Sequence, residues 1–462
     1  MSSFSLFFNL FLLILPQVLN PQYAYSYSNV EFLPGFDGRL PFKLETGYIG
    51  VGESEDVQLF YYFVESEKNP EEDPLIIWLT GGPGCSSLSG FAYEIGPFSF
   101  DTINYNGGFP SLVLNPKSWT KAANIIFLDS PVLTGFSYAR TPTAAKGTDI
   151  EACGYAHEFL RKWLIDHPQF ISNEFYVGGD SYSGLLVPVL THIISEGIPA
   201  GIKPIINLKG YILGNPVTSP SDRNYKIPYS HGLGFISSEL YKSLKKHCKG
   251  EYFQIDPNNA LCYQNVQAFN KCTNQINDKH ILEPNCDFDY VNPPPLFGKR
   301  RSLDDIFRKP NKEFSCRAEE FILVITWANN RDVQEALHVR KGTIKEWVRC
   351  NRHLTSFTKT VANSVPYHTK LSIQGYRSLI YSGDHDFSVP FLATSAWIKS
   401  LNYSIVDEWR PWIVNNQVAG YTRTYSNQMT FATVKGGGHT APTYRPEECF
   451  AMLERWISYE PI

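Results

Sequence analysis

Residues 179–184 have the sequence GDSYSG, which contains the residue types that nucleophilic catalysis by a serine requires. They follow the apolar run 175–177 and precede the largely apolar run 185–190. A strand that ends in a tight turn of small residues and leads into a helix is the setting of a nucleophile elbow, whose usual pattern is G-x-S-x-G. Ser183 takes the place of the second glycine and is small enough for the turn. The pattern predicts Ser181 as a nucleophile; an idle serine in a strand-to-helix turn is the alternative unless partners exist.

Partners for Ser181 follow in the chain order serine, acid, histidine, which is the order of one known class of catalytic triads. Asp384 follows a predicted strand in the segment YSGDHD, and His439 follows three glycines just before the last predicted helix. In such a triad Ser181 attacks, His439 takes its proton, and Asp384 orients the imidazole and offsets its charge. Asp386 as the acid and His385 as the base are rival assignments, although their sequence neighbours fit a bound rather than a catalytic role.

An oxyanion hole is predicted in residues 80–87, TGGPGCSS, which come directly after a buried apolar run. Three glycines in five residues let backbone N–H groups approach a substrate closely. Such a hole takes one N–H from this early loop and one from the residue after the nucleophile, here Gly82 and Tyr182. A phosphate-binding loop is the competing use of such glycines, but it requires a following lysine, and none is present here.

Apolar runs at residues 75–79, 124–128 and 378–381 are typical of parallel strands that are buried on both faces. Helical patterns at residues 150–166 and 445–458 accompany these strands. Alternating strands and helices predict an α/β fold with a central, mostly parallel sheet.

Residues 215–326 differ in composition and are predicted to form a cap insertion of short helices with disulfide bonds. They are rich in proline, asparagine and cysteine and show no clear strand. Within the insertion, residues 292–315 contain three consecutive prolines and the basic run Lys299-Arg300-Arg301, with too little apolar surface to order themselves. This segment is predicted to be a disordered linker. It is either a plain exposed loop or a site of proteolytic cleavage, and cleavage would leave two polypeptides joined by disulfides.

The chain has 462 residues, enough for one large domain with insertions. With 41 basic and 45 acidic residues and no basic block, neither nucleic acid nor an anionic membrane is an expected partner. The apolar stretch 4–15 and the small-x-small site Ala24-Tyr25-Ser26 predict a signal peptide over residues 1–26 and a mature chain of 27–462. No later stretch reaches the roughly 18 apolar residues of a membrane helix. The protein is therefore expected in the secretory pathway without a membrane anchor, with a glycan on Asn402 of the sequon Asn402-Tyr403-Ser404.

Nine cysteines in that compartment imply disulfides and at least one free thiol. The spacing contains no C-x-x-C pair and no nearby pair of histidines, so no metal site is predicted and no cofactor is expected. Counting alone leaves the connectivity open. Cys153 and Cys449 lie in helical patterns, which favours buried thiols over reactive ones.

Five blocks of sequence together resemble the serine carboxypeptidase family, from roughly residue 30 to the C-terminus. They are WLTGGPGCSS at 78–87, PVLTGFSY at 131–138, the elbow at 179–184, YSGD at 381–384 and GGH at 437–439. The resemblance implies an α/β-hydrolase fold with a helical insertion and a vacuolar or extracellular location. It also implies the functional residues already named: the triad Ser181, Asp384 and His439, and the oxyanion donors Gly82 and Tyr182.

The same resemblance implies the disulfides Cys85–Cys350, Cys248–Cys262 and Cys286–Cys316, which leaves Cys153, Cys272 and Cys449 free. One residue departs from the family pattern. Leu133 stands where the family usually has glycine, which puts the backbone conformation of that loop in question.

Several positions near the predicted nucleophile differ from those of the peptidase members. Thr80 replaces an asparagine, while Asp180 and Ser183 replace glutamate and alanine. The asparagine and glutamate help to bind the terminal carboxylate of a peptide, so their replacement weakens a site built for a carboxylate. Together with His385 and Thr440-Ala441, these residues resemble those of the plant serine carboxypeptidase-like acyltransferases, which move an acyl group from a 1-O-glucose ester onto an alcohol or amine.

The resemblance therefore predicts an acyltransferase that forms an acyl-enzyme on Ser181, with Thr80, Gly81 and Asp180 in contact with substrate. The expected partners are a small-molecule acyl glucose donor and its acceptor. The chain is expected as a monomer, or as two disulfide-linked chains if the linker is cleaved, and in the vacuole or outside the cell. A serine carboxypeptidase or esterase is the alternative function, and a non-catalytic protein on the same fold is a further one.

Overall fold

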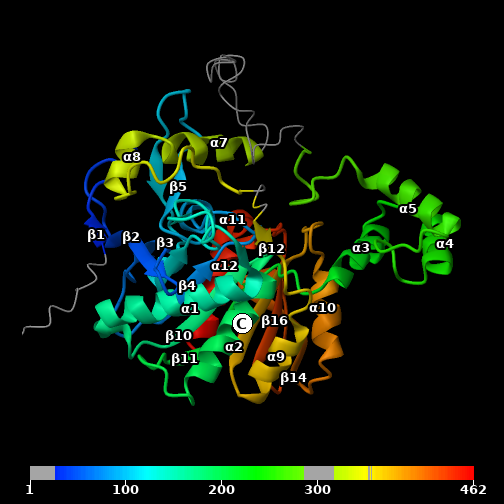
Figure 1. Cartoon of the computed structure of the whole chain (residues 1–462). Coiled ribbons are helices and arrows are strands. Elements are labelled where there is room, and N and C mark those ends of the chain that lie inside the picture. Colours follow the sequence, from blue (N-terminus) through cyan, green and yellow to red (C-terminus); the bar gives the residue numbers. More distant parts are fainter. Residues whose placement is uncertain (1–25, 286–316, 352–353, 355) are drawn as a thin grey trace, which may run out of the picture.

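The structure, a computed structural model, describes residues 26–285, 317–351, 354 and 356–462 (Figure 1). The predicted linker 292–315, the predicted bridge Cys286–Cys316 and the predicted signal peptide up to residue 25 lie outside these residues.

A twelve-stranded sheet forms the centre of the molecule, in the order β1-β2-β3-β7-β4-β10-β11-β13-β16-β15-β14, with β8 also paired to β3. The six central strands β7, β4, β10, β11, β13 and β16 run parallel to one another, and the strands on both sides of them are antiparallel. The strands of this sheet are β1 (Ser26–Val30), β2 (Leu44–Val51), β3 (Val57–Val64), β4 (Leu75–Leu79), β7 (Asn124–Leu128), β8 (Tyr138–Ala139), β10 (Phe175–Asp180), β11 (Leu208–Gly214), β13 (Arg377–Gly383), β14 (Ile405–Val414), β15 (Gln417–Tyr425) and β16 (Met429–Val434). Two small sheets pair β5 (Phe98–Phe100) with β6 (Leu112–Leu114) and β9 (Gly147–Thr148) with β12 (Phe357–Thr358).

The central strands are largely apolar because helices cover both faces of the sheet. Successive residues of β4 enter opposite cores: Ile76 and Trp78 lie in one, and Leu75 and Ile77 in the other. The first core includes side chains of α7 (Arg317–Ala328), α8 (Arg331–Ala336), α11 (Ala441–Tyr444) and α12 (Pro446–Ile457). The second includes side chains of α1 (Asp149–Asp166), α2 (Ser183–Gly197), α9 (Val365–Ile373) and α10 (Phe391–Ser400).

The insertion after β11 stands away from the sheet as a group of short helices (Figure 1). It contains the short helix η4 (Pro220–Tyr225), α3 (Lys226–Gly232), α4 (Ser238–Cys248) and α5 (Ala260–Thr273). The last three contribute to a small core, which also includes Phe387 from outside the insertion. Helix α7, at the end of the predicted insertion, packs instead in the main core. The part that stands apart is therefore shorter than the predicted range 215–326.

Three further short helices are η1 (Gly90–Glu94), η2 (Trp119–Lys121) and η3 (Pro168–Phe170). Among the described residues, no helix combines the length and the apolar character that crossing a bilayer requires.

Candidate active site

Ser181 lies in the turn between β10 and α2, where the sequence predicts a nucleophile elbow. Its φ angle of 53° is in the left-handed region, which is uncommon for a residue other than glycine. Gly81 packs directly against it, since a Cβ atom at residue 81 would lie 2.7 Å from the Cβ of Ser181. The tight turn exposes the hydroxyl of Ser181 at the carboxyl edge of the parallel strands.

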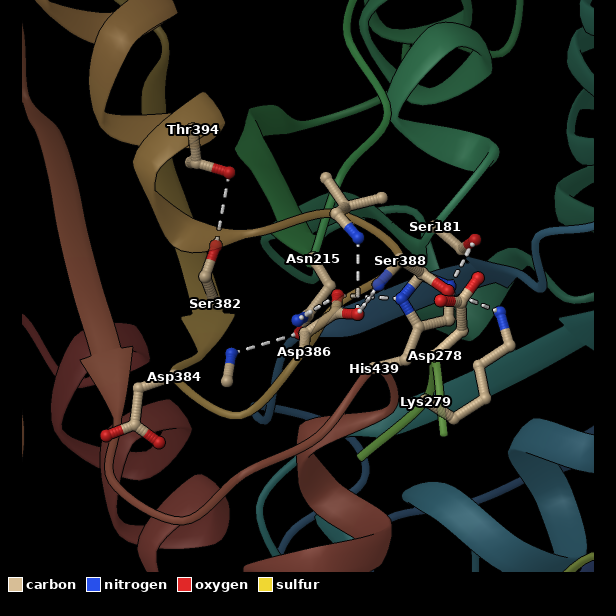
Figure 2. Close-up of polar contacts among 12 residues, drawn as sticks. Ser181, Asn215, Asp278, Lys279, Ser382, Asp384, Asp386, Ser388, Thr394 and His439 are labelled. Carbon is tan, nitrogen blue, oxygen red and sulfur yellow. Dashed lines mark hydrogen bonds and ion pairs between the residues drawn. The ribbon is translucent and has the colours of Figure 1, made fainter. Parts of the chain in front are cut away.

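The hydroxyl of Ser181 lies 2.7 Å from Nε2 of His439, and Nδ1 of His439 lies 2.8 Å from Oδ2 of Asp386. A carboxylate can only accept, so Nδ1 carries a proton and donates it to Asp386. The other nitrogen, Nε2, is then free to accept the hydroxyl proton of Ser181. The three side chains have the order and the polarity of a catalytic triad (Figure 2).

The prediction of Asp384 as the triad acid is wrong, and the rival Asp386 takes that position. Asp384 turns away from His439 and accepts the backbone N–H of Gly436 through Oδ1 at 2.7 Å (Figure 2). The chain bends after β13, which places two acids that are two residues apart on different sides of the loop. His385, the rival base, has its Nε2 3.9 Å from Oδ1 of Asp384 and makes no contact with Ser181.

Asp386 is completely buried, and its carboxylate accepts four hydrogen bonds. Oδ1 accepts the backbone N–H groups of Ser388 at 2.7 Å and Val389 at 3.2 Å. Oδ2 accepts the side-chain amide of Asn215 at 2.8 Å, besides His439. These donors fix the orientation of the carboxylate beside the imidazole of His439, as the triad requires. Sequence reasoning missed Asn215, and nothing in its local pattern marks it.

The predicted oxyanion donors Gly82 and Tyr182 flank the nucleophile. Gly82 has a φ of 121°, a conformation that only glycine adopts readily. Within the described residues, neither backbone N–H has an internal hydrogen-bond acceptor. Both groups are therefore available to a substrate oxygen, and their role in binding an oxyanion stays a prediction.

One disulfide and two hydrogen bonds hold the loop that carries Gly82, and the segment next to it, on one side. The predicted disulfide Cys85–Cys350 is confirmed and ties this loop to the segment before β12. The carbonyl oxygen of Gly84 also accepts the backbone N–H of Asn351 at 2.8 Å. The side-chain amide of Asn351 donates to the carbonyl oxygen of Leu133 at 3.1 Å.

A buried carboxylate braces the same loop from its other side. Asp129 accepts the hydroxyl of Ser86 at 2.7 Å, the N–H of Ser87 at 2.8 Å and the N–H of Phe136 at 2.9 Å. Burial raises the pKa of Asp129 to about 7, against the opposing effect of these donors. Leu133, in the neighbouring block, has a φ of 69°, so it adopts the conformation that glycine takes more easily.

Charged groups lie close behind the nucleophile. Asp180 is buried, and its Oδ1 accepts the N–H of Gly81 at 2.9 Å. Burial raises the pKa of Asp180, although the charge of His439 and this N–H oppose the shift. Burial and the charge of Asp180 raise the pKa of Glu94 well above its usual range, while Arg349 acts in the opposite direction. Sequence reasoning missed Glu94 and Arg349, because only the fold brings them to Asp180.

Thr80, the third predicted substrate residue, is buried, and its hydroxyl has no hydrogen-bond partner among the described residues.

The predicted bridge Cys248–Cys262 is confirmed and joins α4 to α5. Cys153 and Cys449 are buried free thiols, and Cys272 is an exposed one. Asn402, exposed after α10, stays a predicted glycosylation site. No group of side chains in the described ranges is arranged to hold a metal ion.

A serine, a histidine and an aspartate at the carboxyl edge of a mostly parallel sheet define the class of α/β-hydrolase-fold enzymes. Kex1(Δ)P, a prohormone-processing carboxypeptidase from Saccharomyces cerevisiae, has the same fold, with a TM-score of 0.73 over 93% of this chain and 95% of that chain at 19% identity.

The family model for serine carboxypeptidases matches residues 34–459, and the chain therefore belongs to the serine carboxypeptidase family. Similar curated proteins of Arabidopsis thaliana include serine carboxypeptidase-like 11, which is 54% identical over 98% of both chains. Serine carboxypeptidase-like 10 is 56% identical over 94% of both chains. The protein is thus a plant-type serine carboxypeptidase-like protein with a Ser181–His439–Asp386 triad.

Proposed function

We propose that this protein transfers an acyl group from a 1-O-glucose ester to an alcohol or amine acceptor. The observation that carries the proposal is the surroundings of Asp180 and Thr80. The carboxylate of Asp180 accepts the N–H of Gly81, at the start of the loop of residues 80–87. Thr80 offers a hydroxyl in place of the amide that peptidase members use. A site with these two changes is less suited to a peptide carboxylate, which favours a neutral sugar ester as the substrate.

The triad supports acyl transfer in two half-reactions. Ser181 attacks the acyl carbonyl carbon while His439 takes the hydroxyl proton, and the N–H groups of Gly82 and Tyr182 bind the developing oxyanion. The bond to the anomeric oxygen of glucose then breaks, His439 returns the proton to that oxygen, and glucose leaves. In the second half-reaction His439 takes the proton of the acceptor, the acceptor attacks the Ser181 ester, and the proton returns to Ser181.

Transfer competes with hydrolysis because water can attack the same acyl-enzyme. A bound acceptor wins only when it is held close to the ester carbon, since positioning supplies a large effective concentration. The proposal therefore includes an acceptor site beside Ser181, and the acyl glucose and the acceptor are the expected small-molecule partners.

The two disulfides of the described residues are consistent with the secretory pathway, and we propose the vacuole as the location, with the extracellular space as the alternative. Cleavage within residues 292–315 into two linked chains stays a prediction. Electrophoresis of the native protein with and without reductant tests it directly.

A carboxypeptidase is the second candidate, and the Glu94–Asp180 pair favours it. Burial raises the pKa of both carboxyl groups, which favours their protonated forms, and a protonated carboxyl group can donate a hydrogen bond to a substrate carboxylate. A panel of 1-O-acyl glucoses and blocked dipeptides separates the two functions. We expect a higher kcat/KM for at least one acyl glucose than for any dipeptide; rapid dipeptide hydrolysis without consumption of any acyl glucose would establish the carboxypeptidase instead.

A further inference from the structure

The catalytic histidine lies at the end of a short loop, residues 436–439, which we call the glycine loop. Gly436, Gly437 and Gly438 precede the catalytic histidine and have no side chains to pack. The position of His439 relative to Ser181 must therefore be set by hydrogen bonds from other parts of the chain, and several of them come from the insertion.

The insertion segment 278–281 contacts the loops that carry Asp386 and His439. The carbonyl oxygen of Lys279 accepts the backbone N–H of His439 at 2.7 Å. The carbonyl oxygen of Asp278 accepts the N–H groups of Phe387 at 3.1 Å and Ser388 at 2.8 Å, directly after the catalytic Asp386. Figure 2 shows Asp278 and Lys279 beside the triad, although they lie more than 100 residues before Asp386 and His439 in sequence.

His280 makes the only side-chain hydrogen bond from this segment to the glycine loop in the described residues, with Nε2 3.3 Å from the carbonyl oxygen of Gly436. Its other nitrogen, Nδ1, accepts the backbone N–H of Leu282 at 3.2 Å. A carbonyl only accepts and an N–H only donates, so both bonds form together when the ring is neutral and carries its proton on Nε2.

The ring of His280 is buried and has little freedom to move. It packs between the rings of Tyr444 and His385, with centroid distances of 4.7 and 5.0 Å. The segment itself is anchored on the insertion side, since Lys226 of α3 lies 3.3 Å from the carboxylate of Asp278 and over the ring of Phe387. Arg445 also donates to the carbonyl oxygen of Gly436 at 3.3 Å, so this oxygen accepts hydrogen bonds from two side chains.

We propose that the insertion segment 278–281 positions the catalytic histidine, and that His280 is the positioning residue whose side chain fixes the glycine loop through Gly436. The insertion is then part of the frame that holds the triad. His280 touches no reacting atom, and its effect is transmitted through the backbone of residues 436–439. The inference rests on the triad and is independent of which acceptor takes the acyl group.

Two substitutions of His280 separate the bond to Gly436 from the bond to Leu282. His280→Gln keeps a donor near the position of Nε2. His280→Asn keeps an acceptor near the position of Nδ1, but its shorter side chain brings no donor to the position of Nε2. The readouts are the rate constant for labelling of Ser181 by a fluorophosphonate, and kcat and KM for p-nitrophenyl acetate. Neither probe requires an acyl glucose, so the result does not depend on the proposed acyl transfer.

We expect His280→Asn to lower the labelling rate and kcat about tenfold with KM changed less than twofold, because a small misplacement of a catalytic group reduces rate steeply. His280→Gln should stay within about threefold of the wild type. His247→Gln, which alters a histidine of α4 far from the triad, is the matched control and should leave both rates unchanged.

A folded His280→Asn variant with the labelling rate of the wild type would overturn the proposal, as would recovery by asparagine but not by glutamine. Thermal unfolding identifies any variant that fails to fold. If His280→Asn does not fold, Lys226→Met is tested in its place, because it removes the ion pair that holds Asp278 from outside the segment. A fall of about threefold in labelling rate supports the proposal, and an unchanged rate contradicts it.

Discussion

At the scale of single residues, the reactivity of Ser181 depends on groups that do not react themselves. Asp386 can orient His439 because Asn215 and two backbone N–H groups fix its carboxylate. Asp384, only two residues away, binds the glycine loop instead and so supports the same histidine from its backbone side. The two acids therefore have separable roles, which predicts different responses to the same substitution.

Asp386→Asn should lower kcat by about four orders of magnitude, because the amide cannot impose the tautomer that the triad requires. Asp384→Asn should lower it less than about tenfold, since the amide oxygen can still accept the N–H of Gly436. Steady-state hydrolysis of p-nitrophenyl acetate by the two purified variants measures this difference. The larger loss at Asp384 would contradict the assignment of the acid.

The double substitution Thr80→Asn with Asp180→Glu should raise the ratio of dipeptide to acyl glucose turnover. Each restored hydrogen bond to a charged carboxylate is worth about 1.5–3 kcal/mol when its geometry is good, which is up to two orders of magnitude in that ratio. Comparing kcat/KM for both substrate types in the variant and the wild type tests this. An unchanged ratio would show that these two positions do not set the choice of substrate.

The sequence was sufficient to predict the serine and the histidine, but it could not decide between the two acids. Ser181 lies in a recognisable turn, and His439 follows a distinctive run of glycines. Asp384 and Asp386 both follow the same strand within three residues, so their spacing alone carries no preference. The choice is made by long-range partners, above all Asn215, which is far away in the sequence and has no motif of its own.

At the scale of elements, the loop of residues 80–87, which carries the predicted oxyanion donor Gly82, is bound from two sides. Asp129 binds one part of it through Ser86 and Ser87, and the Cys85–Cys350 bridge holds the other. The loop must resist movement when charge develops on a substrate oxygen, because donors that are already in place cost no reorganisation.

Replacing Cys85 and Cys350 together by serine should lower both stability and the rate of Ser181 labelling. The bridge spans 265 residues, and the chain-entropy model gives on the order of 5 kcal/mol for such a loop. The matched control is the double serine variant of Cys248 and Cys262, which should loosen α4 and α5 with a smaller effect on labelling. Equal labelling rates in the wild type and the Cys85/Cys350 variant would show that the bridge is not needed to hold the loop.

The central strands could be predicted well because burial on both faces makes them largely apolar. Leu75–Leu79 and Asn124–Leu128 have the predicted bounds, and helix α1 begins one residue before its predicted start. The end of the insertion was not predictable in the same way. Helix α7 follows a segment of unusual composition, and only its packing in the main core shows that it belongs to the body of the molecule.

At the scale of the whole molecule, a buried ion pair links the first strands of the sheet to α1. His167 follows the C-terminus of α1, and its Nε2 lies 3.0 Å from Oε2 of Glu45 in β2. Burial alone would lower the pKa of His167, but the hydrogen bond and the charge of Glu45 outweigh it and raise the pKa above its usual value. The pair therefore contributes stability that depends on pH.

A raised histidine pKa means that the folded state binds a proton more tightly than the unfolded state. The contribution is complete below the unfolded value of about 6.5 and is lost as the pH rises through the folded pKa. Glu45→Gln should therefore destabilise the protein by about 1–3 kcal/mol at pH 5, and clearly less at pH 8. Urea unfolding at both pH values measures this, with Glu31→Gln, which removes an exposed pair with Arg39, as the control. A loss that is equal at the two pH values would contradict the assigned protonation.

The central claim, acyl transfer through Ser181, is tested most directly by the fate of the acyl group as acceptor is added. The measurement follows glucose, free acid and acylated acceptor released from a 1-O-acyl glucose at increasing concentrations of an acceptor alcohol. We expect the acylated product to rise and the free acid to fall, with no glucose released by Ser181→Ala. Free acid as the sole product at every acceptor concentration, together with efficient cleavage of blocked dipeptides, would contradict the account.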